Sequence, residues 1–141
     1  MMDKTNQIFK LTAPYKNPYQ GNKKRLLFVC SVGMLRSPTA AAVASSLGYN
    51  SRSCGSNLSC ALIPISVNLI EWADKIIFIN PSNYNESIEN FKNFDYDFMI
   101  KQKSIIWEID DKYDAFSEEL NNLIIKLFDK SFVEIHKKGI E

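Results

Sequence analysis

The chain has 141 residues, of which 45% are hydrophobic and 23% charged, values typical of one globular domain with a sizeable core. The formal net charge is +1, so no global field attracts nucleic acid or an acidic membrane, and we expect neither as a partner. No apolar run approaches membrane-spanning length and no secretory signal is visible. Cys30, Cys54 and Cys60 are odd in number and lack CxxC spacing. We therefore expect no disulfide framework, metal or cofactor, and a reducing cytoplasmic environment.

The beginning of the chain differs in character from the rest. It lacks hydrophobic periodicity and carries Pro14, Pro18 and Gly21. This pattern predicts an irregular N-terminal arm over residues 1–24, followed by one domain over residues 25–141.

From Arg25 onward, extended apolar segments alternate with helical patterns. Strands are expected at residues 26–29, 50–54, 75–79 and 104–109. Helices are expected at residues 38–47, 65–73 and 81–91, with a long final helix capped by Ser117. Apolar residues at helical spacing give that last helix a core-facing stripe, formed by Leu120, Leu123, Ile124, Leu127 and Phe128. The alternation predicts an α/β fold, a three-layer α/β/α sandwich with a central four-stranded parallel sheet.

In such sheets, ligands bind at the carboxyl ends of the strands. Cys30 ends the first expected strand, and an acidic loop at residues 110–116 follows the fourth. Because parallel strands end at the same edge, we expect the cysteine and the acidic loop to lie on one side of the molecule.

The segment from Cys30 to Ser37 has the residue types of an oxyanion cradle. A short loop follows the cysteine, and Arg36 directly precedes a helix start at Ser37 and Pro38. Backbone N–H groups of the loop and the helix N-terminus would converge on one point, where Arg36 adds a forked, charged donor. Positive potential there favours the thiolate form of Cys30, and the Ser37 hydroxyl can donate to that sulfur. The loop residues expected to surround the bound anion are Ser31, Val32, Gly33, Met34 and Leu35.

These residues could cleave a phosphate monoester in two steps through a phosphocysteine intermediate. The leaving oxygen needs a proton, which a carboxylic acid opposite the thiolate would supply. The acidic segment offers several carboxylates, and its residues alone leave the choice open among Glu108, Asp110, Asp111 and Asp114. A solvated turn that caps the last helix is the competing interpretation of this cluster.

The chain resembles the low-molecular-weight protein tyrosine phosphatase superfamily, and especially its small prokaryotic branch. The matching motifs are LLFVCS, LRSPTA, SRSCGS, the WAD before a strand, and EIDDKYDAFSEEL, which together run from Leu26 to Leu127. The resemblance implies that Cys30 is the nucleophile, that Arg36 binds phosphate and that Ser37 supports the thiolate.

The same resemblance implies a choice of general acid. The family's late acid loop usually reads Asp-Pro-Tyr, which is matched here by Asp111, Lys112 and Tyr113. Asp111 is therefore implied as the acid, and Tyr113 as a residue beside the substrate. The chain departs from the family at Gly33, where an Asn often braces the loop, at Leu35, where many members have a second cysteine, and at Lys112, where they have proline.

We therefore expect a cysteine-dependent phosphomonoester hydrolase, with phosphotyrosine as one candidate substrate. Its partner would be a phosphorylated protein or a small phosphomonoester, and a phosphate- or sulfate-type anion would occupy the active site. One alternative is a phosphate- or phosphoprotein-binding module with little turnover. The other is an arsenate reductase, which would need Cys54 and Cys60 as resolving cysteines.

Overall fold

The computed structural model describes residues 24–32, 36–92, 95–110, 112–114 and 116–137, with only the backbone described for residues 132–137. The expected N-terminal arm lies outside this part of the chain, except for Lys24.

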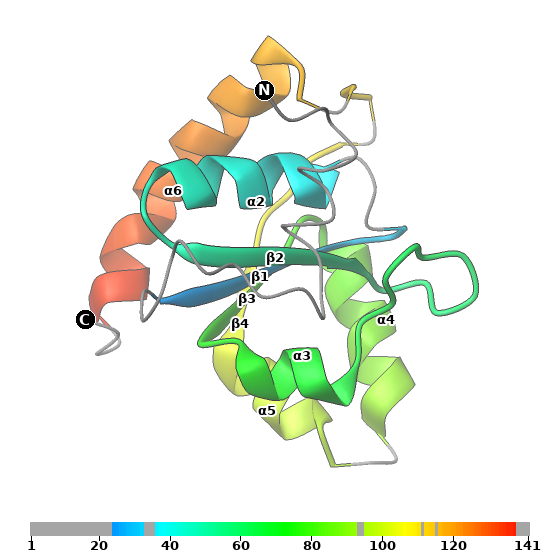
Figure 1. Ribbon diagram of the computed structural model, residues 1–141. Helices are drawn as coiled ribbons and strands as arrows, with labels where there is room; N and C mark the ends of the chain where they lie inside the picture. The colour runs from blue at the N-terminus through cyan, green and yellow to red at the C-terminus, as the bar shows by residue number, and fades with distance from the viewer. Residues whose placement is uncertain (1–23, 33–35, 93–94, 111, 115, 138–141) are drawn as a thin grey trace.

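The described residues form a four-stranded parallel sheet with the strand order β2-β1-β3-β4 (Figure 1). The strands are β1 (Arg25–Cys30), β2 (Asn50–Gly55), β3 (Lys75–Phe78) and β4 (Ser104–Ile106). This arrangement confirms the predicted sheet and places the end of β1 near its centre, between β2 and β3.

Backbone pairing with β3 continues past the end of β4. The amide of Trp107 donates to the Phe78 carbonyl at 2.8 Å, and the amide of Ile109 donates to the Ile79 carbonyl at 2.9 Å. Extended pairing therefore reaches Ile109, as the sequence predicts, and delivers the acidic segment to the edge of the sheet where β1 ends.

Helices cover both faces of the sheet (Figure 1). Helices α2 (Arg36–Ser46) and α6 (Glu118–Lys137) lie on one face. On the other face lie α3 (Val67–Trp72), α4 (Pro81–Phe91) and α5 (Asp97–Lys103). The three-layer prediction is confirmed. Helix α5 is an addition that the sequence analysis did not predict, because among its seven residues only Ile100 is buried and no apolar stripe develops.

Strand β1 alternates strictly between the two cores. Leu26, Phe28 and Cys30 face α2 and α6, whereas Leu27 and Val29 face the opposite layer. All five side chains are at most 2% exposed. The alternation fixes the direction of Cys30, whose sulfur lies on the α2 side of the sheet.

Local signals mark the helix boundaries that the sequence predicts. Gly48 follows α2 with a φ of +94°, and the Tyr49 amide donates back to the Ala44 carbonyl at 3.1 Å. The Ser117 hydroxyl accepts from the Leu120 amide at 3.2 Å and so caps α6. The apolar stripe of α6 packs inward as expected, with Leu120, Ile124 and Phe128 buried. None of the described helices is both long and apolar enough to cross a membrane.

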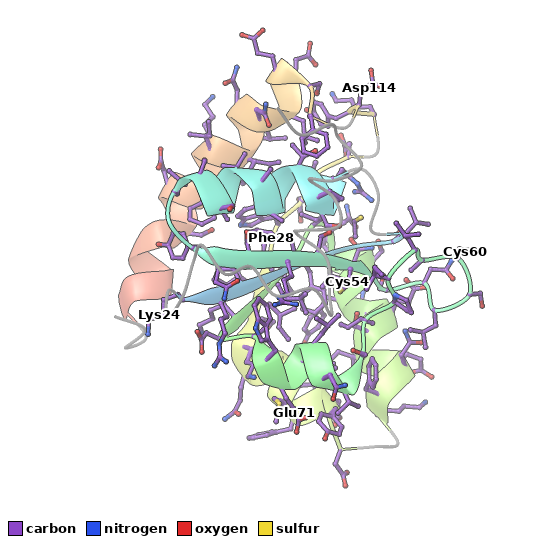
Figure 2. All side chains as sticks on the ribbon, in the orientation of Figure 1. Lys24, Phe28, Cys54, Cys60, Glu71 and Asp114 are labelled. Carbon is purple, nitrogen blue, oxygen red and sulfur yellow. The ribbon has the colours of Figure 1, made fainter. Side chains whose placement is uncertain are left out.

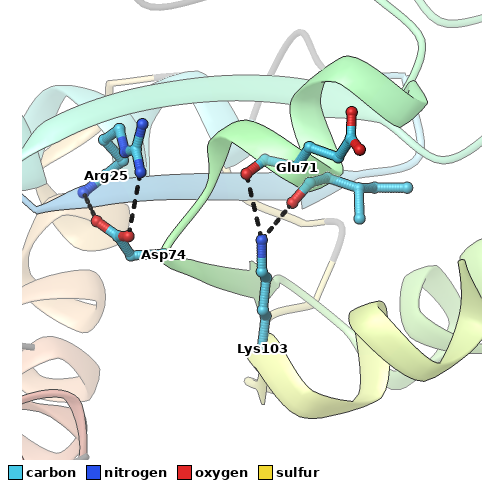
Figure 3. Close-up of polar contacts among 5 residues, drawn as sticks. Arg25, Glu71, Asp74 and Lys103 are labelled. Atoms are coloured by element: carbon cyan, nitrogen blue, oxygen red, sulfur yellow. Dashed lines mark hydrogen bonds and ion pairs between the residues drawn. The ribbon is translucent and has the colours of Figure 1, made fainter. Parts of the chain in front are cut away.

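Two polar junctions join the segment that follows α3 to the start of β1, and α5 to the end of α3 (Figure 3). Asp74 accepts from the Arg25 backbone amide at 2.9 Å and from the Arg25 guanidinium at 3.4 Å. The Lys103 ammonium donates to the carbonyls of Ile70 and Glu71 at 2.7 and 3.3 Å. Because these carbonyls lie in the last turn of α3, Lys103 supplies the cation that a helix C-terminus favours.

Replacing Lys103 by methionine should therefore lower the free energy of unfolding by about 1 kcal/mol, since the Ile70 carbonyl loses its donor. Lys101→Met on the same helix is the matched control, because Lys101 is exposed, and it should change stability by less than about 0.5 kcal/mol. Urea-induced unfolding measures both variants. Equal effects of the two substitutions would contradict the assigned role of Lys103.

Candidate active site

The sulfur of Cys30 and the hydroxyl of Ser37 form the centre of the site. Cys30 Sγ lies 3.0 Å from Ser37 Oγ, and Ser37 Oγ lies 3.4 Å from the Cys54 carbonyl oxygen. The single hydroxyl proton of Ser37 can point at either partner. With a neutral thiol, Cys30 donates to Ser37 and Ser37 donates to the carbonyl; with a thiolate, Ser37 turns its proton toward the sulfur. The pair can therefore serve both states of the cysteine.

Arg36 opens α2 directly beside this pair. Its side chain is buried, and Nη1 donates to the Ile109 carbonyl at 2.7 Å. The guanidinium is thus held between the helix start and the segment that follows β4. A fixed guanidinium at this position is suited to binding an anion because it is planar, permanently charged and carries several donors.

The acidic segment is attached at both ends to the first turn of α2. Arg36 holds its beginning at Ile109, and the Thr39 hydroxyl accepts from the Phe116 amide at 2.9 Å. Arg36 and Thr39 are three residues apart and so lie on the same side of the helix. The loop therefore starts and ends beside the helix N-terminus, which confirms that the cysteine and the acidic loop share one side of the molecule.

The structure describes three of the four candidate carboxylates of this segment. Glu108, Asp110 and Asp114 are exposed, and Figure 2 shows Asp114 above the first turn of α2. Asp111 lies outside the described residues, and its role as the acid stays a prediction. Tyr113 is partly buried against the core under α2, with the Lys112 ammonium 5.3 Å from its ring centroid.

The first part of the loop after Cys30 is fixed by hydrogen bonds to its carbonyl groups. The carbonyl of Cys30 accepts from the Ser56 amide at 2.8 Å, that of Ser31 from the Asn57 amide at 2.9 Å, and that of Val32 from the Leu62 amide at 3.1 Å. In a planar trans peptide the N–H points opposite to the preceding carbonyl. The N–H groups of Ser31 and Val32 are therefore directed away from residues 56–62, as a cradle requires. The other predicted loop residues, Gly33, Met34 and Leu35, lie outside the described part of the chain.

Gly55 permits this close approach. A Cβ atom at this position would lie 2.6 Å from the Ser31 carbonyl oxygen, 2.7 Å from the Val32 carbonyl carbon and 2.6 Å from the Ala61 Cβ. In the sequence Gly55 indicated only the end of a strand, whereas in the structure the absence of its side chain lets the loop lie against β2.

Helix α4 contributes a second layer of polar contacts that the sequence analysis did not predict. Asn83 Nδ2 donates to Ser31 Oγ at 3.2 Å and to Ser56 Oγ at 3.4 Å. Ser56 Oγ donates to the Glu86 carboxylate at 2.6 Å, and Asn90 Nδ2 donates to the Ser56 carbonyl at 2.9 Å. The available signal was the spacing of Asn83, Glu86 and Asn90, which places polar groups on one side of a helix that begins at the same sheet edge.

The other two cysteines lie in different environments. Cys54 is fully buried on the opposite face of the sheet, with Leu27 and Val29. Burial, and secondarily the charge of Cys30, raise the pKa of the Cys54 thiol well above its usual range. Cys60 is exposed on the loop that follows β2 (Figure 2). Because Cys54 faces away from Cys30, the arrangement does not favour the disulfide relay that arsenate reduction needs.

No protein-family model matches the sequence, and neither does any curated protein. Solved structures do match the fold. The YwlE arginine phosphatase from Geobacillus stearothermophilus has a TM-score of 0.58 at 19% identity, covering 81% of this chain and 96% of its own. Wzb from Vibrio vulnificus, solved with benzylphosphonate, has a TM-score of 0.58 at 16% identity, and the match covers 83% of this chain and 99% of Wzb. A low-molecular-weight protein tyrosine phosphatase from Bacillus subtilis has a TM-score of 0.58 at 18% identity, and the match covers 83% of this chain and 99% of that protein. The fold is therefore that of the low-molecular-weight phosphatases, as the sequence predicts.

Gly55→Ala should disturb the site strongly, because the new Cβ meets the backbone of the loop itself. We expect at least a tenfold loss of affinity for inorganic phosphate, or about 1.4 kcal/mol, measured by calorimetry. The double variant Gly55→Ala/Ala61→Gly removes only the contact with Ala61 and should not restore binding. Full restoration in the double variant, or unchanged binding in the single one, would show that the loop is not constrained by Gly55.

Proposed function

We propose that this protein is a cysteine-dependent phosphomonoester hydrolase that works through a phosphocysteine intermediate. The observation that carries the proposal is the 3.0 Å contact between Cys30 Sγ and Ser37 Oγ at the start of α2. The buried Arg36 adjoins this pair, and the preceding loop directs N–H groups away from its supporting segment. One edge of the sheet would thus combine a nucleophile, Cys30, with a hydroxyl that can donate to its sulfur, that of Ser37, and with donors for an anion.

In the first step the Cys30 thiolate attacks phosphorus in line. An S–P bond forms as the bond between phosphorus and the leaving oxygen breaks. Arg36 and the loop N–H groups stabilise the charge on the equatorial oxygens. A carboxylic acid donates its proton to the leaving oxygen, so the alcohol or phenol departs neutral.

In the second step water attacks the phosphocysteine. The same carboxylate, now deprotonated, accepts a proton from the water, and the S–P bond breaks to give inorganic phosphate and the Cys30 thiolate. The Ser37 hydroxyl donates to the sulfur as its negative charge returns, which makes the thiolate a better leaving group.

We assign the acid to Asp111. The assignment is supported by the Asp-Lys-Tyr pattern at residues 111–113 and by the anchoring of the acidic segment to Arg36 and Thr39, which keeps the loop beside the nucleophile. Tyr113, two residues later, would contribute to the wall of the substrate site.

The substrate we propose is a phosphorylated protein or a small phosphomonoester, with phosphotyrosine as the specific candidate. Support comes from similar structures that include a protein tyrosine phosphatase and a complex with benzylphosphonate. The similarity to an arginine phosphatase makes phosphoarginine the substrate to compare with it. We place the reaction in the cytoplasm, where a reducing environment keeps Cys30, Cys54 and Cys60 as the free thiols seen here.

Hydrolysis of a generic aryl phosphate tests the proposal directly. Cys30→Ser should lower kcat by roughly a thousandfold or more, because the covalent step loses its nucleophile. Cys60→Ser is the matched control and should retain wild-type activity, since Cys60 is exposed. Phosphate binding by a wild-type protein without turnover would instead identify a binding module. Activity that persists in Cys30→Ser would contradict the assigned nucleophile.

The role of Arg36 predicts a loss on conservative substitution. Arg36→Lys keeps the charge but loses the fork that matches two phosphate oxygens, so kcat/KM should fall by at least roughly tenfold. Arg52→Lys is the control, because Arg52 is equally buried but stacks on Trp72 in the opposite layer. Equal activity of the Arg36→Lys variant and the wild-type protein would exclude the forked clamp, and equal losses in both variants would indicate a general effect on folding.

A leaving-group series tests the acid. Asp111→Asn should slow the hydrolysis of esters with leaving groups of high pKa most, because those oxygens depend on the proton. Asp110→Asn and Asp114→Asn should have milder effects and serve as controls. A steep dependence on leaving-group pKa in the Asp110 variant, with none in the Asp111 variant, would move the acid to position 110.

A further inference from the structure

Four polar side chains connect α4 to the loop that follows Cys30. They are Glu86 and Asn83 on α4, Ser56 directly after β2, and Ser31 in the loop. The contacts run from Glu86 to Ser56 at 2.6 Å, from Ser56 to Asn83 at 3.4 Å and from Asn83 to Ser31 at 3.2 Å. Asn83 lies in the middle of the series and is 1% exposed.

The hydrogen bonds in this series have a defined direction. The Glu86 carboxylate accepts and has no proton to give, so the Ser56 hydroxyl donates to it. Ser56 has only one proton, and its oxygen must therefore accept from Asn83. This requirement turns the NH₂ group of Asn83 toward both serines, and its two hydrogens go to Ser56 and Ser31. In the reverse orientation, Asn83 Oδ1 would face Ser56 and the contact would have no proton.

The direction determines what Ser31 can do. Its oxygen accepts from Asn83, so its own hydroxyl proton is left to donate, and within the described residues that proton has no acceptor. Asn83 Oδ1 is buried and likewise has no partner in the described part of the chain. An unsatisfied buried carbonyl lowers stability, and so the amide orientation is held by the two serines at some cost to the fold.

We propose that the Ser31 hydroxyl donates a hydrogen bond to an oxygen of the bound phosphoryl group, and that Asn83 is the positioning residue that directs it there. Ser31 is the first residue after the nucleophile, and its backbone N–H is already directed away from residues 56–62. The hydroxyl adds a side-chain donor to the backbone donors of the cradle, and Glu86 keeps the whole series in the donating direction. The proposal rests on the proposed function, because it concerns the same anion.

Inorganic phosphate is the probe, with binding measured by calorimetry in the Cys30→Ser background and KM and kcat measured with an aryl phosphate in proteins that retain Cys30. Ser31→Ala should weaken phosphate binding by about tenfold or more, the scale of one hydrogen bond to a charged group. Ser31→Thr keeps a hydroxyl and should stay within about twofold of the parent protein.

The Asn83 variants separate positioning from packing. Asn83→Ala should match Ser31→Ala, and combining the two should cause no further loss, because both remove one hydrogen bond to the anion. Asn83→Asp should bind phosphate more weakly than Asn83→Ala, since its carboxylate takes the Ser31 proton and repels the anion. Asn85→Ala is the control on the same helix; Asn85 is exposed, and its loss should leave phosphate affinity unchanged. The losses should appear in KM and in phosphate affinity more than in thermal stability.

Two results would overturn the proposal. One is phosphate affinity in Asn83→Asp equal to or better than that in Asn83→Ala; the other is additive losses in the Ser31→Ala/Asn83→Ala protein. If the Asn83 variants do not fold, equal binding by Ser31→Ala and Ser31→Thr overturns it. A protein without turnover whose phosphate binding follows the expected order would contradict the proposed hydrolase and retain this proposal. Normal turnover together with unchanged phosphate binding in Asn83→Asp would support the proposed hydrolase and contradict the role proposed for Ser31 and Asn83.

Discussion

The carbonyl groups of Cys30, Ser31 and Val32 all turn toward one segment, residues 56–62, and the site depends on this constraint. Hydrogen bonds to the carbonyls of Cys30 and Ser31 set the peptide planes, and planarity then directs the N–H groups of Ser31 and Val32 to the other side. Contact this close requires a residue without a side chain at Gly55, where a Cβ would lie 2.6 Å from the Ser31 oxygen. The proposed anion cradle would therefore be a consequence of how tightly the described part of the loop packs on the end of β2.

The first turn of α2 ties the remaining parts of the site to that loop. Arg36 holds the backbone after β4, Ser37 contacts Cys30, and Thr39 holds the far end of the acidic segment. Each of the three side chains is buried, so each contact is shielded from competing water. One helical turn thus places Cys30, Arg36 and the acidic segment relative to one another, which is the preorganisation that the proposed phosphoryl transfer would require.

The sequence was sufficient for features set by local pattern. The strands and most helices follow from apolar runs, and the spacing of Cys30, Arg36 and Ser37 lies within one strand–loop–helix unit. Contacts between distant segments were not predictable in this way. In the sequence Thr39 is an ordinary helix residue, and only the structure shows that it contacts Phe116. Likewise, the contact between Asn83 and Ser31 depends on how α4 packs against the loop. Helix α5 was missed because it is short and buries one residue fully. The assignment of the acid to Asp111 stays a prediction.

Peptide-resolved alkylation with iodoacetate tests most directly whether Cys30 is a thiolate at the base of an anion cradle. Cys30 should be labelled at neutral pH, and inorganic phosphate at about ten times its dissociation constant should slow this labelling roughly tenfold. The exposed Cys60 should react at a rate that phosphate does not change, and the buried Cys54 should remain unlabelled in the folded protein. Labelling of Cys30 that is insensitive to phosphate, or no faster than that of Cys54, would contradict the account.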